Sequence, residues 1–213
     1  MNYKKLADML FPNINTTISY YEEKVFPIRN LKTGAKVTRL GPSPTGFIHL
    51  GNLYGAFVDE RLAHQSEGVF MLRIEDTDEK RKVEGAVETI ISSLKYFGLN
   101  FDEGATIDGE KGSYGPYFQS NRVEIYQCVA KYMIEQGRAY PCFCTEEELE
   151  EVRKLQEAES VNTGYYGKWA KDRDITVEEV QAHLDNNDSF VIRFKSNGTT
   201  EGIFEIEDAI RGK

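Results

Sequence analysis

The fold of this chain is decided by the segment Val37-Thr-Arg-Leu-Gly-Pro-Ser-Pro-Thr-Gly-Phe-Ile-His-Leu-Gly-Asn52, together with Phe70-Met-Leu-Arg-Ile-Glu-Asp-Thr-Asp78. A short apolar strand runs into a turn, where two prolines fix the backbone and end the strand. Apolar residues then recur at helical spacing, and a second apolar strand follows at 69–74. This order of strand, helix and strand predicts the β–α–β unit of an α/β nucleotide-binding fold.

The turn before the helix has the residues of a phosphate-binding site. Gly46 and Gly51 bracket His49, and glycine lets the backbone come close to a ligand. Asn52 is the expected N-cap, so the free N–H groups and the positive end of the helix dipole face the space beside His49. A lone histidine is more simply a solvent-exposed loop residue, but the Pro-Ser-Pro-Thr-Gly turn favours a role at phosphate.

The second strand ends in three acids, Glu75, Asp76 and Asp78. One explanation is structural: Thr77 or Asp78 caps a following helix, which we predict from the apolar residues between 83 and 94. Paired acids can also bind a hard cation such as Mg²⁺. We expect magnesium to arrive with a nucleotide instead, and we predict no metal site formed by the protein.

The two segments resemble the N-terminal catalytic region of the glutamyl-tRNA synthetases, a family of class I aminoacyl-tRNA synthetases. The resemblance continues through Gly115–Arg122 and Tyr165–Gly167, and then through Ile192-Arg193 and Ile210-Arg-Gly212, so that it covers about residues 36–213. The Pro-Ser-Pro-Thr turn is similar to that of the glutamate enzymes rather than the glutamine enzymes. Asn52 stands where the class I His-x-Gly-His motif has its last histidine.

This resemblance implies a reaction, a fold and a set of site residues. The family joins glutamate to ATP, which carries Mg²⁺, releases pyrophosphate, and passes the glutamyl group to the 3′ end of tRNA(Glu). The implied fold is the first half of a class I Rossmann-type domain with an α+β acceptor-stem-binding insertion. The implied residues are His49 and Gly51 for catalysis; Pro42, His49, Gly51 and Asn52 for ATP; Arg39, Ser43 and Glu75 for glutamate; and Asp76, Thr77, Asp78 and Arg81 for the tRNA acceptor end. Arg39 is expected to pair with the substrate's side-chain carboxylate and Glu75 with its ammonium group.

The domain organisation follows from the same resemblance. We expect an N-terminal extension at 1–35, the first half of the Rossmann-type domain at 36–102, and the insertion at 103–213. The family's lysine-rich loop, the second Rossmann half and an anticodon-binding region are not found in the sequence. We therefore expect an N-terminal fragment of a longer enzyme that has little or no activity by itself. The sequence does not indicate an oligomeric state.

Three other functions compete with this interpretation. A catalytically inactive tRNA acceptor-binding module is disfavoured because Arg39, Ser43, His49 and Glu75 are all present. A short enzyme that glutamylates a modified tRNA base shares the activation step, but the N-terminal extension is unexpected for it. Another nucleotidyl transferase with a His-x-Gly motif is disfavoured by the Arg-Ile-Glu-Asp-Thr-Asp segment.

The second half of the chain gives a coarser prediction. Loops are expected at 102–105 and 108–113, a helix at 121–136 closed by Gly137, and strands at 190–195 and 203–209. Capping boxes are predicted for Thr145 with Glu148 and for Thr176 with Glu179. Near the N-terminus, Leu6 and Leu10 indicate one amphipathic helix, and a second is expected after Tyr20.

The three cysteines do not form a disulfide framework. Cys142 and Cys144 are half of a zinc site, and many family members supply a second Cys/His pair near 165–171. That segment has neither residue here, and the remaining candidates are Cys128, inside a predicted helix, and His183. We therefore predict no structural zinc and an insertion held by apolar packing.

Composition bounds the remaining possibilities. A net charge of −9 argues against indiscriminate nucleic-acid binding, although a local basic face can still contact tRNA. No apolar run is long enough to span a membrane, and the N-terminus lacks the features of a signal peptide. We expect a cytoplasmic protein, because free cysteines suit a reducing compartment.

Overall fold

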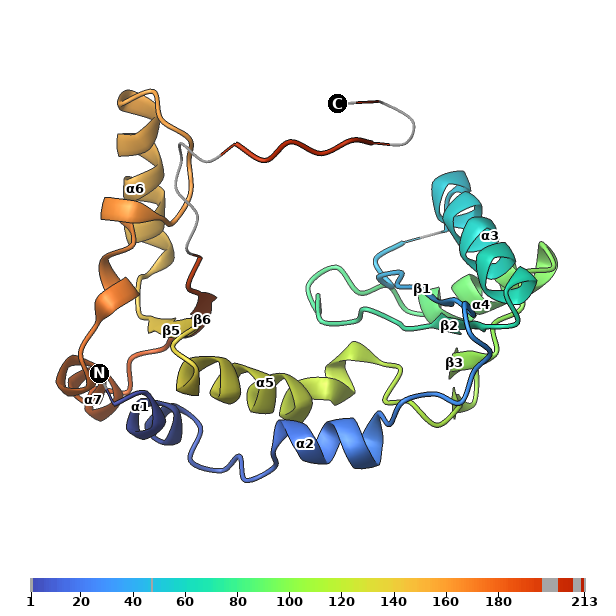
Figure 1. Ribbon diagram of the computed structural model, residues 1–213. Helices are drawn as coiled ribbons and strands as arrows, with labels where there is room; N and C mark the ends of the chain where they lie inside the picture. Colours follow the sequence, from blue (N-terminus) through green and yellow to red (C-terminus); the bar gives the residue numbers. More distant parts are fainter. Residues whose placement is uncertain (1, 47, 197–202, 209–211, 213) are drawn as a thin grey trace. The chain divides into compact units, whose positions relative to one another are not determined.

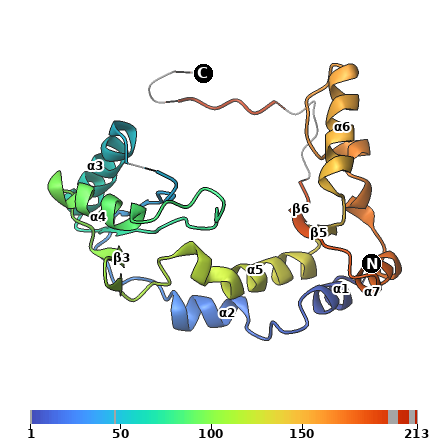
Figure 2. The same cartoon turned by 180° about the vertical axis from the view of Figure 1, so that it is seen from behind.

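The computed structural model describes residues 2–46, 48–196, 203–208 and 212. The chain divides into two compact units, a larger one of residues 15–128 and a smaller one that joins residues 1–14 to 129–213. Figures 1 and 2 show the ribbon from opposite sides. Among the described residues, no helix has the length and apolar character needed to cross a bilayer.

The larger unit is built on a four-stranded sheet. Its strands are β1 (Val37–Leu40), β2 (Val69–Leu72), β3 (Glu103–Thr106) and β4 (Gly109–Lys111), hydrogen-bonded in that order. The first three run parallel, and β4 returns antiparallel to β3. Two helices make the connections: α3 (Leu50–Gln65) joins β1 to β2, and α4 (Ala86–Tyr96) lies between β2 and β3. The predicted β–α–β unit and the α/β class are confirmed.

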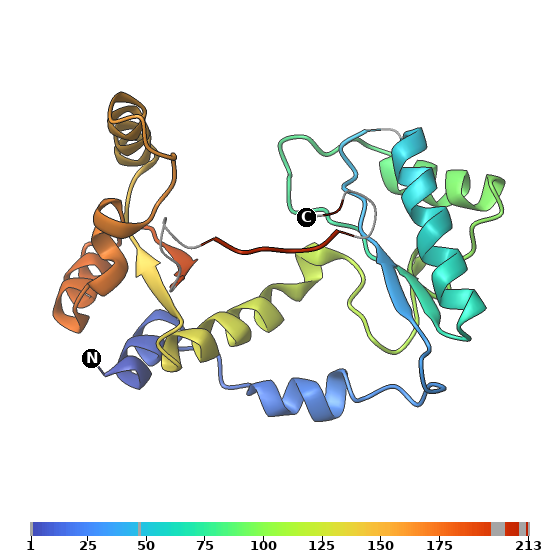
Figure 3. The ribbon, with the colours of Figure 1, turned by 45° about the horizontal axis from the view of Figure 1, so that its top comes forward.

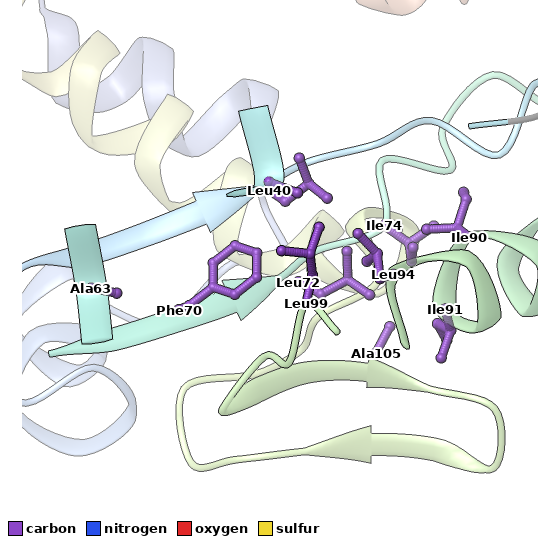
Figure 4. Close-up of a cluster of buried hydrophobic side chains, with 11 residues drawn as sticks. Leu40, Ala63, Phe70, Leu72, Ile74, Ile90, Ile91, Leu94, Leu99 and Ala105 are labelled. Atoms are coloured by element: carbon purple, nitrogen blue, oxygen red, sulfur yellow. The ribbon is translucent and has the colours of Figure 1, made fainter. Parts of the chain in front are cut away.

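Alternation along β2 explains where the core of this unit lies. Phe70, Leu72 and Ile74 are fully buried, whereas the residues between them are only partly covered. The buried side chains meet α4 and the small residues Ala56 and Ala63 of α3; Figure 4 shows Ala63 in this cluster. Small residues let α3 come close to the sheet, beside which it lies in Figure 3. The odd-numbered side chains lie on the other face, where Val37, Val69 and Met71 precede the charged residues near the strand ends.

The helix predicted from Val83 begins later than expected. Ala86 is its first residue, after Gly85 with φ +74°, and neither Thr77 nor Asp78 caps it. The Val83 N–H donates instead to the Pro44 carbonyl (2.9 Å), which keeps this segment extended beside the turn after β1. Asp78 accepts the backbone N–H of Arg81, so it closes a local turn.

The loops predicted at 102–105 and 108–113 were wrong, because β3 and β4 form there. Their sequence is polar and rich in glycine, and tertiary contacts hold it in the sheet. Arg29 donates from both guanidinium nitrogens to Glu103 of β3 (2.6 and 2.7 Å), and the Tyr117 hydroxyl donates to the same carboxylate (2.8 Å). Arg29 comes from the predicted N-terminal extension, of which residues 15–35 are part of the larger unit and residues 1–14 of the smaller one.

The larger unit contains further helical segments, the last of which extends into the smaller unit. They are α2 (Ile18–Tyr20), which continues as a π-helix (Tyr21–Val25), and a 3₁₀ turn (Gln119–Arg122) that leads into α5 (Val123–Glu135). The helices predicted after Tyr20 and at 121–136 are therefore confirmed. Gly137 follows α5 with φ +65°, as expected for a residue that ends a helix.

The smaller unit combines helices with a two-stranded sheet. It contains α1 (Tyr3–Leu10), β5 (Ala139–Cys142), α6 (Glu146–Ala158), two 3₁₀ turns (Gly167–Trp169 and Lys171–Asp174), α7 (Val177–Asp185) and β6 (Val191–Phe194). β5 and β6 pair antiparallel, and α1 lies beside α7 (Figures 1 and 2). The N-terminal helix packs its predicted apolar residues, Leu6 and Leu10, into the core of this unit.

Both capping boxes of the smaller unit are confirmed, at Thr145 with Glu148 and at Thr176 with Glu179. The strand predicted at 190–195 is β6. The strand predicted at 203–209 was wrong for residues 203–207, which have no strand conformation. Ile203 and Phe204 are each 89% exposed, so strand-forming side chains alone did not produce a strand there. Residues 197–202, which separate these two segments, Ala209, and Ile210-Arg211 of the family motif lie outside the described residues.

One buried carboxylate joins two separate segments of the smaller unit. Asp172 is 7% exposed, and its Oδ2 accepts the backbone N–H of Phe143 (2.8 Å). This bond fastens the 3₁₀ turn at 171–174 to the end of β5. A buried N–H without an acceptor costs about 1–3 kcal/mol, so the bond stabilises the unit mainly by preventing that loss.

Replacing Asp172 by Ala is therefore expected to destabilise the smaller unit by about 1–3 kcal/mol, because the Phe143 N–H loses its acceptor. The matched control is Asp174→Ala in the same turn, where the side chain is 81% exposed and the change should stay within about 0.5 kcal/mol. Urea unfolding followed by tryptophan fluorescence suits this test, since Trp169 is the only tryptophan in the chain. Equal stabilities of the two variants would contradict a stabilising role for the hydrogen bond from the Phe143 N–H to Asp172.

Candidate active site

His49 begins the helix after the turn, in the place that we predicted for Asn52. It has the extended conformation of an N-cap (φ −110°, ψ 169°), and its Nδ1 accepts the Gly51 N–H (3.2 Å). Its own N–H donates to Oδ1 of Asn52 (3.2 Å), so the two side chains satisfy donors at the start of α3 reciprocally. Asn52 is therefore the third residue of the helix rather than its cap.

The cap defines which nitrogen of His49 can meet a ligand. Because Nδ1 accepts a hydrogen bond, the neutral ring carries its proton on Nε2, which is a free donor among the described residues. Gly51 makes this geometry possible: a Cβ there would lie 3.1 Å from both Cε1 and Nδ1 of His49. The imidazole is exposed and so presents an N–H to the solvent beside the helix N-terminus.

A cavity of about 360 Å³ opens beside this histidine. Cavities of this size are typical of small-molecule sites. Its lining residues are Pro42, Ser43, Thr45, Gly46, Ile48, His49, Asn52 and Ile90. The structure thus brings together three of the four residues predicted for ATP, together with Ser43. Gly51, the fourth, lies under the imidazole and does not line the cavity itself.

Arg39 and Glu75 meet at the carboxyl ends of β1 and β2. Arg39 Nη1 lies 2.5 Å from Glu75 Oε1, and Arg73 Nη2 donates to the same oxygen (3.0 Å). Burial acts to raise the pKa of Glu75, but the hydrogen bonds from Arg73 and Arg39 hold it below its usual value. Glu75 is therefore ionised at neutral pH, and the group carries two positive charges and one negative charge.

Backbone pairing explains why these side chains come together. Leu40 faces Leu72 in the last register pair, and pairing continues beyond the strands: Arg73 N–H donates to the Leu40 carbonyl (3.0 Å) and Glu75 N–H to the Pro42 carbonyl (2.9 Å). The segment after β2 therefore stays alongside the segment after β1. Its odd-numbered residues remain on the face opposite the core.

Gly41 lies directly beneath the ion pair. A Cβ at this position would be 2.4 Å from Arg39 Nη1 and 2.6 Å from Glu75 Oε1. The contact between the two side chains thus needs a residue without a side chain between them. Sequence reasoning missed both Gly41 and Arg73 as site residues. Period-two spacing from Glu75 could have identified Arg73, whereas nothing in the sequence marks Gly41.

The four residues predicted for the tRNA acceptor end differ in their surroundings. Asp76 is buried, and its two carboxylate oxygens accept the Ser120 N–H (2.9 Å) and hydroxyl (2.8 Å). Asp78 pairs with Arg81 (2.6 Å to Nε), and Thr77 and Arg81 are exposed. The structure thus brings Asp78 and Arg81 together at the surface and uses Asp76 inside the unit.

Cys142 and Cys144 lie close to Asp172, a third residue that can bind a metal ion and that sequence reasoning missed. Ligand atoms of Cys142, Cys144 and Asp172 lie within 4.8 Å of one another. Of the candidates weighed from the sequence, His183 instead pairs with Asp188 (2.7 Å), and Cys128 donates to the Thr16 carbonyl. Only Cys and His had been considered as partners, so the acid was overlooked.

The described residues of this cluster do not complete a structural zinc site. Tetrahedral zinc takes four ligands, and three are present. Asp172 already accepts the Phe143 N–H, the Tyr165 hydroxyl lies 3.1 Å from Cys144 Sγ, and the Arg193 guanidinium lies over the Tyr165 ring (4.2 Å). Burial raises the pKa of the Cys144 thiol to about 11, so this thiol is protonated at neutral pH.

Comparison with known proteins finds the family that the sequence motifs resemble. The family model of class I tRNA synthetases (E and Q), catalytic domain, matches residues 36–213. A glutamate–tRNA ligase of Acetivibrio thermocellus is 77% identical over the whole chain, which covers 39% of that protein; for a ligase of Clostridium beijerinckii the identity is 52% and the coverage 38%. The chain thus spans about two fifths of the length of these relatives.

A solved structure gives the same result. The crystal structure of a glutamate tRNA ligase from Elizabethkingia meningosepticum in complex with its amino acid matches 83% of this chain and 35% of its own, with a TM-score of 0.70 and 36% sequence identity. The match of the family model to most of the chain, together with these relatives, shows that this chain belongs to the catalytic-domain family of class I glutamyl- and glutaminyl-tRNA synthetases.

Proposed function

We propose that this chain carries part of the active site of a glutamate–tRNA ligase. The enzyme activates glutamate with ATP to give glutamyl-adenylate and pyrophosphate, and it then transfers the glutamyl group to the 3′ end of tRNA(Glu). The observation that carries the proposal is the ion pair of Arg39 and Glu75, which offers one charge of each sign at the strand ends. The relatives named as glutamate–tRNA ligases support it.

The ion pair matches two charged groups of glutamate: the side-chain carboxylate, which distinguishes it from most amino acids, and the ammonium group, which all amino acids share. In this proposal Arg39 binds the side-chain carboxylate, which its planar guanidinium can grip with two parallel hydrogen bonds. Glu75 binds the ammonium group, and Ser43 contributes a hydroxyl from the wall of the neighbouring cavity. With Arg73 included, the group has an excess of one positive charge, which favours a substrate that bears two carboxylates.

The cavity beside His49 is the proposed site of the ATP phosphates. The N–H groups at the start of α3 and the Nε2 proton of His49 are donors for phosphate oxygens, and the helix dipole favours their charge. Attack of the substrate α-carboxylate on the α-phosphorus expels pyrophosphate. The protein then mainly positions the two reactants and stabilises the charge that develops on the phosphate. Mg²⁺ belongs to the bound ATP.

Transfer to tRNA completes the proposed reaction. The exposed Thr77 and Arg81 and the half-buried Asp78 follow the glutamate site directly, which suits contact with the 3′ end of the acceptor strand. The buried Asp76 would support this segment through Ser120. The three free cysteines fit a reducing cytoplasm, where tRNA charging takes place.

The function is tested by incubating the full-length protein with labelled glutamate, ATP and tRNA(Glu). The proposal predicts label in an alkali-labile ester at the 3′-terminal adenosine, which is lost when that nucleotide is removed. Label that survives removal of the terminal adenosine would instead indicate glutamylation of an internal base. Absence of labelling would contradict both activities.

Replacing His49 separates its helix-capping role from its role at phosphate. His49→Ala should lower the charging rate of the full-length enzyme by about 10²-fold and its stability by about 1 kcal/mol, through loss of the cap. His49→Asn is the matched variant, because asparagine is a good N-cap but has no imidazole. It should keep the stability and lose the rate. Wild-type activity in His49→Asn would remove the imidazole from the mechanism.

Replacing Gly41 tests whether the ion pair is the glutamate site. The Cβ of Gly41→Ala would meet the ends of two flexible side chains, so stability should change by less than about 1 kcal/mol while the pair is displaced. We expect the KM for glutamate to rise about tenfold and the KM for ATP to stay the same. Gly55→Ala, in the middle of α3 with open space around it, is the control and should leave both constants unchanged. Equal KM values for glutamate in the two variants would contradict the assignment.

A further inference from the structure

Arg73 is the one member of the charged group at the strand ends to which the proposed function gives only a positive charge and no contact with the substrate. It is the least accessible of the three: its side chain is 23% exposed, against 42% for Arg39 and 31% for Glu75. Its backbone N–H is fixed to the Leu40 carbonyl, and its guanidinium donates to Oε1 of Glu75. Within the described residues, the buried Nε–H has no acceptor, so the contact with Glu75 is the polar contact that orients this guanidinium.

Both arginines share a single oxygen of Glu75. Arg39 Nη1 and Arg73 Nη2 lie 2.5 and 3.0 Å from Oε1, whereas Oε2 meets no donor among the described residues. The two arginines are not equivalent, because Arg39 is the more exposed and lies above Gly41, where no side chain confines it. Arg39 can therefore leave Glu75 without disturbing the contact made by Arg73.

Under the proposed function, glutamate binding requires that separation. Arg39 must turn to the side-chain carboxylate of the substrate, and Glu75 must face its ammonium group. The internal ion pair is then exchanged for two intermolecular ones. If Arg39 were the only partner of Glu75, the Glu75 side chain would gain rotamers when Arg39 left, and it could follow Arg39 or turn into solvent. A second cation on the same oxygen prevents this.

We propose that Arg73 is a positioning residue for the amino-acid substrate: it holds the Glu75 carboxylate in place when Arg39 leaves it for the side-chain carboxylate of glutamate. This inference rests on the proposed function and adds a residue to it. Arg73 itself touches no substrate atom. It acts through Glu75, and so its effect is confined to the half of the site that binds the ammonium group.

Steady-state charging of tRNA(Glu) by the full-length enzyme tests this role. Arg73→Gln should raise the KM for glutamate about tenfold or more, while kcat and the KM for ATP change by less than about threefold. Arg73→Lys should recover part of the loss, because an ammonium group keeps the charge but lacks the planar fork. The matched control is Arg153→Gln on α6, which removes a guanidinium from an exposed ion pair with Glu150 and should leave both KM values within about twofold.

A competitor without an ammonium group separates positioning from local folding. Glutarate carries both carboxylates of glutamate but nothing for Glu75 to bind, so Arg73→Gln should weaken glutamate binding and leave the inhibition constant of glutarate unchanged. Equal losses for glutamate and glutarate, a parallel rise in the KM for ATP, or no change in any constant would overturn the role of Arg73. Failure of the wild-type enzyme to charge tRNA(Glu) with glutamate would instead overturn the proposed function, and this inference with it.

Discussion

The parallel pairing of β1 and β2, continued past the ends of both strands, is the constraint on which the candidate site depends. Hydrogen bonds from Arg73 N–H to the Leu40 carbonyl and from Glu75 N–H to the Pro42 carbonyl keep two irregular segments in strand-like register. Alternation then assigns each side chain to a face: Leu40, Leu72 and Ile74 enter the core, while Arg39, Arg73 and Glu75 share the opposite face. One register therefore fixes both the packing of the unit and the charges at its edge.

The sequence allowed the central part of this architecture to be predicted, because its signals are local. Strand–turn–helix–strand order and the spacing of threonine and glutamate in the capping boxes depend on residues close in sequence. β3 and β4 were missed because Arg29, far away along the chain, supplies the contact that holds Glu103 in the sheet. The N-cap of α3 was misassigned for another reason. Asparagine is a preferred N-cap residue, but here His49 is the N-cap and its Nδ1 accepts the hydrogen bond from the first turn.

The candidate site also contains residues that the sequence identifies and residues that only the folded structure reveals. His49, Arg39 and Glu75 could be named from motifs, and the meeting of Arg39 with Glu75 at the strand ends followed from the expected fold. Gly41 and Arg73 could not be named in that way. Arg73 matters through a 3.0 Å contact with the Glu75 side chain, and Gly41 matters because a Cβ there would lie 2.4 Å from Arg39 Nη1; no spacing rule gives either distance. In the smaller unit, two cysteines suggested a metal site, and the contacts of Asp172 with the Phe143 N–H show how a carboxylate can join the same segments directly.

The account stands or falls on what happens to the ion pair of Arg39 and Glu75 when the amino acid binds. The most direct measurement is a pair of crystal structures of the full-length protein, one free and one with glutamate. We predict that glutamate separates Arg39 from Glu75, so that Arg39 binds the side-chain carboxylate and Glu75 binds the ammonium group while keeping its contact with Arg73. Glutamate bound elsewhere, or bound with the ion pair intact, would contradict the account.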